Sequence, residues 1–149
     1  TELKSKHFYI HANTIQKEIG FVFSGLLRAF YVDKEGNEIS VNFISEGRYA
    51  THYSALITQT PCKYYFQCIE PSIIVSLPYK HIQDGYNKFP NLERYGRLVA
   101  EEVFDMIKRG DSPLDCGRVM PPLGKTSAVN FFGFLIKKGG RRIHLSFFH

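Results

Sequence analysis

The sequence predicts a mainly β protein with helices at its C-terminal end: an antiparallel double-stranded β-helix (jelly roll) followed by a short helix and a long dimerisation helix. Between His7 and Leu77, short runs rich in β-branched and aromatic residues are separated by turn signals about every eight to twelve residues, which is typical of sandwiches and barrels. After Pro78 the apolar residues instead recur at helical spacing. The predicted strands are residues 7–11, 20–25, 26–32, 38–44, 64–69 and 72–77.

The run at residues 38–44 shows the strand pattern most clearly. Ile39, Val41 and Phe43 alternate with polar residues, which predicts that these three side chains face the interior of the roll. The preceding segment, residues 33–38, predicts a hairpin turn in which Gly36 takes a positive φ.

Two helices are predicted after the strands. Ile82, Tyr86 and Phe89 lie at spacing i, i+4 and i+7, which predicts a short amphipathic helix that ends before Pro90. The longer helix that follows has apolar residues on two nearly opposite faces. One face recurs at 4-3-4-3 spacing, as in paired helices, and consists of Leu92, Gly96, Val99, Val103 and Met106. The other face consists of Tyr95, Leu98 and Phe104.

A helix that is apolar on two sides needs two partners. We expect one face to cover the roll and the 4-3 face to form a symmetric homodimer interface, with burial in a single core as the alternative. The predicted division of the chain is therefore a β-roll over residues 1–89, a dimerisation helix over 90–109 and an atypical basic tail over 110–149.

Length, charge and cysteine content narrow the class of protein. A chain of 149 residues fits one domain, and no apolar run approaches the length of a bilayer span. Residues 109–149 hold 7 of the 19 Lys and Arg residues and 2 of the 14 Asp and Glu residues. Residues 1–108 therefore hold 12 basic and 12 acidic residues, whose charges cancel. A phosphate-binding face on the body is therefore not predicted. Three cysteines without C-x-x-C spacing, and no secretion signal in TELKSK, favour a reducing cytoplasm.

Six motifs follow one another in a recognisable order: IHAN (10–13), GFVFSGLLR (20–28), DKEGNE (33–38), FISEGRY (43–49), LPY (77–79) and FP (89–90). Together they resemble the sensor domain of the Crp/Fnr family, the cyclic-AMP receptor protein and fumarate–nitrate regulator family of bacterial transcription regulators, over about residues 5–108. The resemblance implies a cyclic-nucleotide-binding-like β-roll, a long helix that dimerises, and a C-terminal winged helix-turn-helix that binds DNA.

The tail departs from the family pattern. Residues 110–149 show neither a sustained helical period nor a helix-turn-helix pattern. We therefore expect the DNA-binding module to be missing or truncated, and DNA contact to come only through a reader domain that is not visible in this chain. The positive charge of the tail would give at most weak binding that ignores DNA sequence.

The nucleotide pocket also departs from the family pattern. Family members that bind cyclic nucleotides use a Gly-Glu pair and an Arg-Ser or Arg-Thr pair, and the matching positions here are Thr51-His52 and Cys62-Lys63. Lys63 supplies a point charge without the forked geometry of a guanidinium, so cyclic AMP is not expected to bind in the usual mode. The candidate ligand-binding residues are Arg48, Thr51, His52, Tyr53, Cys62 and Lys63. Two alternatives stay open: another anion held by Arg48, His52 and Lys63, or an inert pocket filled by Tyr49, Tyr53 and Tyr64.

No other chemistry is indicated. The sequence has no nucleophile–base spacing, P-loop or Rossmann glycine motif, so no enzyme activity, metal or cofactor is predicted. A cupin-like small-molecule or metal-binding protein is the alternative, but the histidines lack the usual His-x-His spacing. The expected function is ligand sensing and dimerisation in a cytoplasmic regulator of the Crp/Fnr type, with an unknown small-molecule effector.

Overall fold

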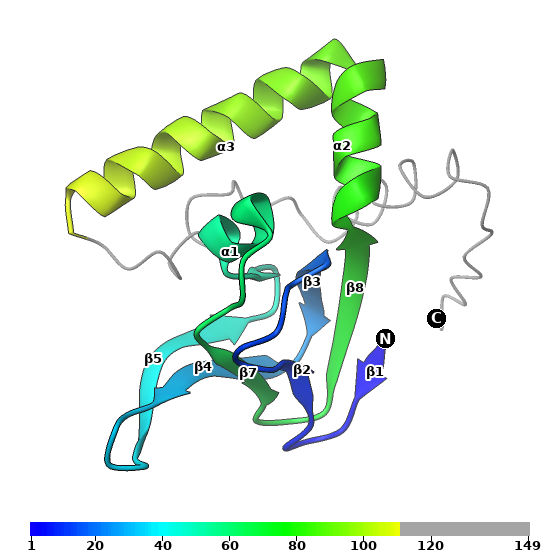
Figure 1. Cartoon of the computed structure of the whole chain (residues 1–149). Coiled ribbons are helices and arrows are strands. Elements are labelled where there is room, and N and C mark those ends of the chain that lie inside the picture. The colour runs from blue at the N-terminus through cyan, green and yellow to red at the C-terminus, as the bar shows by residue number, and fades with distance from the viewer. Residues whose placement is uncertain (111–149) are drawn as a thin grey trace.

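The computed structural model describes residues 1–110, which form two four-stranded antiparallel sheets and three helices (Figure 1). The first sheet has the order β1 (Glu2–Leu3), β8 (Ser72–Pro78), β3 (Glu18–Ser24) and β6 (Tyr49–Ala50). The second has the order β2 (Phe8–Ile10), β7 (Tyr65–Cys68), β4 (Leu26–Val32) and β5 (Glu38–Ser45). The predicted antiparallel roll is confirmed, and each of the six predicted strand runs overlaps an observed strand.

The core of the roll consists of inward-facing apolar side chains from both sheets. Phe21, Val22, Leu27, Phe66 and Ile74 are each no more than 1% exposed. Phe21 and Val22 are neighbours on opposite faces of β3, and both are buried because each face is covered: Phe21 packs in the cluster with Leu56 and Leu92, and Val22 packs in the cluster between the sheets. This buried layer holds the two sheets in fixed positions, and the candidate pocket is built on it.

Tyr9 ties the two sheets together. Its hydroxyl hydrogen-bonds with the Glu18 carboxylate at 3.1 Å and the Ser76 hydroxyl at 2.9 Å, although β2 belongs to the other sheet. The pairing register skips Tyr9, which frees its side chain to cross between the layers. Gly20 leaves room for this ring, since a Cβ at residue 20 would lie 2.6 Å from its Cε1 atom.

The expected inward face of β5 is wrong. Ile39, Val41 and Phe43 are 38%, 36% and 58% exposed. In the ladder with β4, Ala29 pairs with Asn42 and Phe30 with Ser40, so the register skips Val41. After the bulge the inward side chain is Ile44, which is 4% exposed, and not Phe43. Before the bulge every residue of β5 is exposed, because this half of the strand lies at the free edge of its sheet.

Three helices accompany the sheets: α1 (Tyr53–Thr58), α2 (Tyr79–Lys88) and α3 (Pro90–Lys108). Figure 1 shows α2 rising from the end of β8 and α3 running back across the top of the molecule, on the same side as α1. Phe89 has an extended backbone before Pro90, so the predicted break between α2 and α3 is confirmed. None of the helices within residues 1–110 combines the length and apolar character needed to cross a membrane.

Candidate functional site

The candidate pocket is formed by the segment that joins β6 to β7. This segment contains α1, and Thr51, His52 and Cys62 within it are all buried. The loop between β2 and β3 lies beside it, because Asn13 N–H donates to the Cys62 carbonyl at 2.7 Å and Cys62 N–H donates to the Thr14 carbonyl at 2.9 Å. The two segments therefore form one unit at the end of the roll.

Gln16 fixes the start of α1 from this loop. Its side-chain amide donates to the Thr51 hydroxyl at 2.7 Å and to the Glu18 carbonyl at 2.8 Å, and its side-chain carbonyl accepts the His52 backbone N–H at 3.1 Å. Gln16 is 4% exposed and Thr51 2% exposed, so these bonds are shielded from water. The Thr51 hydroxyl and the His52 backbone N–H, at the start of α1, therefore already have hydrogen-bond partners within the protein.

An aromatic ladder, formed by His52, Tyr64 and Tyr31, fills the region next to α1. The ring of Tyr64 packs edge-on against His52 with centroids 5.2 Å apart and against Tyr31 at 6.3 Å. His52 is 8% exposed, and its Nδ1 atom is buried without a hydrogen-bond partner. Such atoms are uncommon in folded proteins and need an explanation.

The electrostatics of this region favour neutral side chains. Burial, and to a smaller extent the positive charge of Lys63, lower the pKa of His52. The imidazole is therefore uncharged at neutral pH. Burial raises the pKa of Cys62, whose sulfur accepts the Tyr64 backbone N–H at 3.4 Å, and burial likewise raises the pKa of Tyr64. Lys63 is exposed, and its positive charge acts on His52.

The other predicted pocket residues lie nearby in the chain but have different surroundings. Arg48 precedes β6 and is half-buried, and its backbone carbonyl accepts the Val22 N–H at 2.9 Å. Tyr53 begins α1 and packs against the buried cluster that includes Leu56 and Leu77. The structure thus links His52 with Lys63, while convergence of Arg48 on them stays a prediction.

The residues of the predicted dimer face on α3 fall into two groups. Leu92 is 8% exposed and belongs to a buried cluster with Phe21, Tyr49 and Leu56. Gly96 faces α2, since a Cβ there would lie 2.5 Å from the Tyr86 hydroxyl. These two residues therefore pack within their own chain. A dimer role for Val99, Val103 and Met106, which also lie in α3, stays a prediction, and the predicted tail from residue 111 onward lies outside the described residues.

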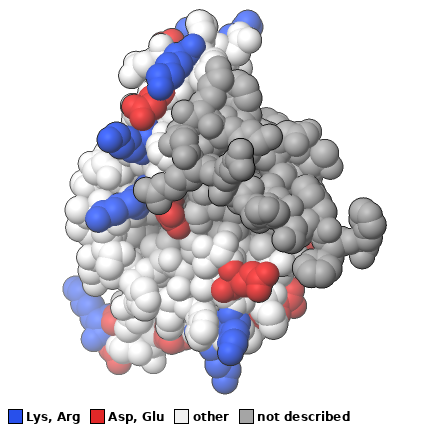
Figure 2. Space-filling view, turned by 90° about the vertical axis from the view of Figure 1, so that its right-hand side faces the viewer, with Lys and Arg blue, Asp and Glu red and all other residues white. Residues whose placement is uncertain are grey.

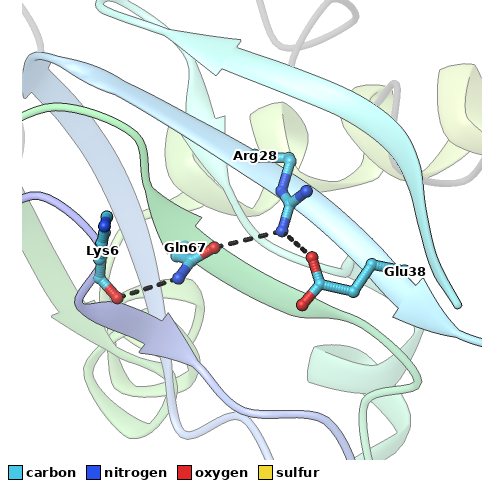
Figure 3. Close-up of polar contacts among 4 residues, drawn as sticks. All are labelled: Lys6, Arg28, Glu38 and Gln67. Carbon is cyan, nitrogen blue, oxygen red and sulfur yellow. Dashed lines mark hydrogen bonds and ion pairs between the residues drawn. The ribbon is translucent and has the colours of Figure 1, made fainter. Parts of the chain in front are cut away.

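A polar cluster on the outer face of the second sheet has a structural role. Arg28 on β4 forms an ion pair with Glu38 on β5 and donates to Gln67 on β7 at 3.2 Å, and Gln67 donates to the Lys6 carbonyl at 3.0 Å (Figure 3). The Arg28 guanidinium also lies 4.1 Å from the centroid of the Phe30 ring. These contacts join three neighbouring strands and leave no charge of Arg28 available for a ligand.

The described surface has mixed charge. On the face that Figure 2 shows, Lys and Arg side chains stand beside Asp and Glu side chains, and neither sign gathers into a broad patch among the described residues. Within residues 1–110, no three His, Cys, Asp or Glu side chains come together in a way that could hold a metal ion. The cupin-like alternative thus finds no ligand group in this part of the chain.

Comparison with solved structures identifies proteins that share this fold. The described strands and helices match the sensor domain of the transcriptional regulator DNR from Pseudomonas aeruginosa with a TM-score of 0.63 and 14% identity, over 73% of this chain and 71% of that chain. The chain has the fold of that sensor domain. The N-terminal domain of a Streptomyces coelicolor A3(2) transcriptional regulator matches with a TM-score of 0.58 and 13% identity, over 63% of this chain and 66% of that chain.

Catabolite activator protein from Thermus thermophilus also matches, with a TM-score of 0.58 and 11% identity, over 96% of this chain and 80% of that chain. No protein-family model matches the sequence, and no curated protein matches it. The sequence motifs and the three-dimensional comparison therefore agree on the fold of Crp/Fnr-type sensor domains.

Gln16 was the residue that sequence reasoning missed. It lies outside every motif quoted above, and its partners Thr51 and His52 are 35 and 36 residues away. Its one local signal is a polar side chain directly after Ile15, which is too common a pattern to identify a buried amide.

Proposed function

We propose that this chain is the effector-sensing and dimerising part of a bacterial transcription regulator, that it acts without catalysis, and that its pocket does not take cyclic AMP in the usual mode. The observation that supports the proposal is the contact of the Tyr64 and His52 rings, whose centroids lie 5.2 Å apart, in the segment that by resemblance corresponds to the nucleotide cradle of the family. On this proposal, these rings take the place that a nucleotide would need.

The chemistry of the segment supports the same proposal. A cyclic phosphodiester needs close backbone approach and a cation with forked geometry. Here Gln16 already accepts the His52 backbone N–H, the thiol of Cys62 is buried, and Lys63 provides a single exposed charge. These groups favour a smaller or different effector.

Side-chain packing connects the candidate pocket to the long helix α3. Leu56 of α1 and Leu92 of α3 belong to the same buried cluster, together with Tyr49 and Phe21. A shift of α1 changes the surface on which the first turn of α3 packs, because close-packed side chains transmit displacement. An effector would then act by shifting the population between two positions of α3, and attached DNA readers would follow.

The proposal also places the protein in the cytoplasm as a homodimer. Cys62 and Cys68 are free, buried thiols, which suits a reducing compartment. Leu98 and Phe104, on the face of α3 opposite the 4-3 face, are 51% and 60% exposed among the described residues. The expectation that this face covers the roll is therefore wrong, and the proposed dimer contact is made by the remaining 4-3 residues Val99, Val103 and Met106.

Sedimentation velocity on the full chain tests the dimer. We expect a dimer at micromolar concentration and a monomer for Val103→Glu, because a carboxylate in a helix–helix seam is buried without a partner. Arg94→Glu, which changes an exposed residue of the same helix, is the matched control and should remain dimeric. A monomeric wild-type chain, or a dimer that Val103→Glu leaves intact, would contradict the proposed interface.

A further inference from the structure

The region around His52 combines three features that are unusual together. An imidazole that is 8% exposed has a buried Nδ1 atom with no partner. Beside it lie two tyrosine rings in edge-on contact, at 5.2 Å and 6.3 Å along the aromatic ladder. Lys63 directly precedes Tyr64 in the chain, is exposed and forms no ion pair with the described residues, and its positive charge contributes to the lowered pKa of His52.

These groups match the parts of one kind of ligand. A lone ammonium offers one positive charge, which balances one carboxylate rather than a phosphate dianion. A neutral imidazole can donate or accept one hydrogen bond at the unpartnered nitrogen. Tyrosine rings pack favourably against another aromatic ring in edge-on or offset geometry.

Larger anions fit these groups poorly. The His52 backbone N–H, which a phosphate at the start of α1 would need, is held by Gln16 at 3.1 Å. Tyr64 contacts both His52 and Tyr31, so a base that stacks between these rings would have to separate them. A smaller ligand would have fewer of these side chains to displace, and Lys63 is exposed.

We propose that this site binds a small aromatic carboxylate, with the carboxylate between Lys63 and the His52 ring and the aromatic ring against Tyr64 and Tyr31. The inference rests on the proposed sensing function and names the effector class for that site. It explains why a buried nitrogen of His52 is left without a partner and why the neighbouring lysine has no counter-charge.

Binding of such an anion has a consequence for the proton on His52. An added negative charge beside the ring favours the imidazolium and opposes the effects of burial and of Lys63. Two other titratable groups that face this region, Cys62 and Tyr64, do not supply a competing negative charge at neutral pH, because burial raises the pKa of both. Carboxylate binding should therefore raise the pKa of His52 and take up a proton.

Benzoate is the probe for this site, with benzamide as its neutral counterpart and acetate as its non-aromatic one. We expect the full chain to bind benzoate with a dissociation constant below about 1 mM, and benzamide and acetate about tenfold more weakly. The NMR signal of the His52 ring, assigned with His52→Asn, should titrate at higher pH when benzoate is saturating. Equal binding of benzamide or of acetate, or no saturation by benzoate, overturns the proposal.

Two lysine variants test the cation. Lys63→Gln should reduce benzoate affinity about tenfold, the size expected for one charge-assisted hydrogen bond. Lys34→Gln, an exposed residue in the hairpin turn, should leave it unchanged. Because Lys63 is exposed, its variant should unfold at the wild-type temperature, and unchanged benzoate binding by it would refute the assignment. The sedimentation test of the dimer is independent, so failure of the ligand class is distinguishable from failure of the proposed function.

Discussion

Gln16 is the residue whose replacement should most clearly expose how the candidate pocket is held together. Gln16→Ala removes the acceptor of the His52 N–H and the donor to the Thr51 hydroxyl, both of which remain buried. Each stranded group costs about 1–3 kcal/mol, so we expect a loss of about 3 kcal/mol in the free energy of unfolding. Urea denaturation followed by circular dichroism measures this loss.

A matched control and a double mutant make the test specific. Gln83→Ala, at an exposed position of α2, should change stability by less than about 0.5 kcal/mol. Adding Thr51→Val to Gln16→Ala removes one stranded hydroxyl, so the double variant should be more stable than the sum of the two single losses. A Gln16→Ala cost below about 1 kcal/mol, or strict additivity with Thr51→Val, would refute the reasoning.

Three further predictions concern the tyrosine between the sheets, the pocket histidine and the contact of α2 with α3. Tyr9→Phe should lower the free energy of unfolding by about 1–2 kcal/mol because the hydrogen bonds to Glu18 and Ser76 are lost, whereas Tyr31→Phe should lower it little. Equal effects would contradict the role of Tyr9 in joining the two sheets. Because the folded pKa of His52 lies below its unfolded value of 6.5, the unfolded state binds more protons, so stability should fall as pH drops below 6.5. Urea titrations at about pH 7.5 and about pH 5.5 measure how far the free energy of unfolding falls between these two pH values. This fall should be smaller for His52→Asn than for His7→Asn, which alters an exposed ring, and equal falls would contradict the role given to His52. Gly96→Ala should lower stability by about 1–3 kcal/mol because the new methyl meets the Tyr86 ring, and pairing it with Tyr86→Leu should recover part of the loss; no recovery would exclude this contact as the cause.

Local patterns predicted most of the fold. The strands and the break at Phe89 before Pro90 depend on side chains that are neighbours in sequence, so propensity and spacing reveal them. The predicted inward face of β5 was wrong because the bulge at Val41 and the edge position of the strand both depend on its pairing with β4. Alternation within one strand does not show where the partner strand skips a residue.

The site was harder to predict because its contacts join distant segments. Replacement of the family's pocket residues by Thr51, His52 and Cys62 was visible in the sequence, but the bonds from Gln16 were not. The 4-3 spacing on α3 likewise says that Gly96 packs against something, without distinguishing α2 of the same chain from a second copy. Spacing identifies a face, whereas its partner depends on tertiary structure.

The most direct test of a pocket filled by its own side chains is calorimetric titration of the full chain with cyclic AMP. The contacts of Tyr64 with His52 and of Gln16 with the start of α1 predict no saturable binding at micromolar concentrations. Saturable binding with a dissociation constant of about 1 μM, a binding free energy of about −8 kcal/mol, would show that these side chains give way to a nucleotide and would contradict the proposed function.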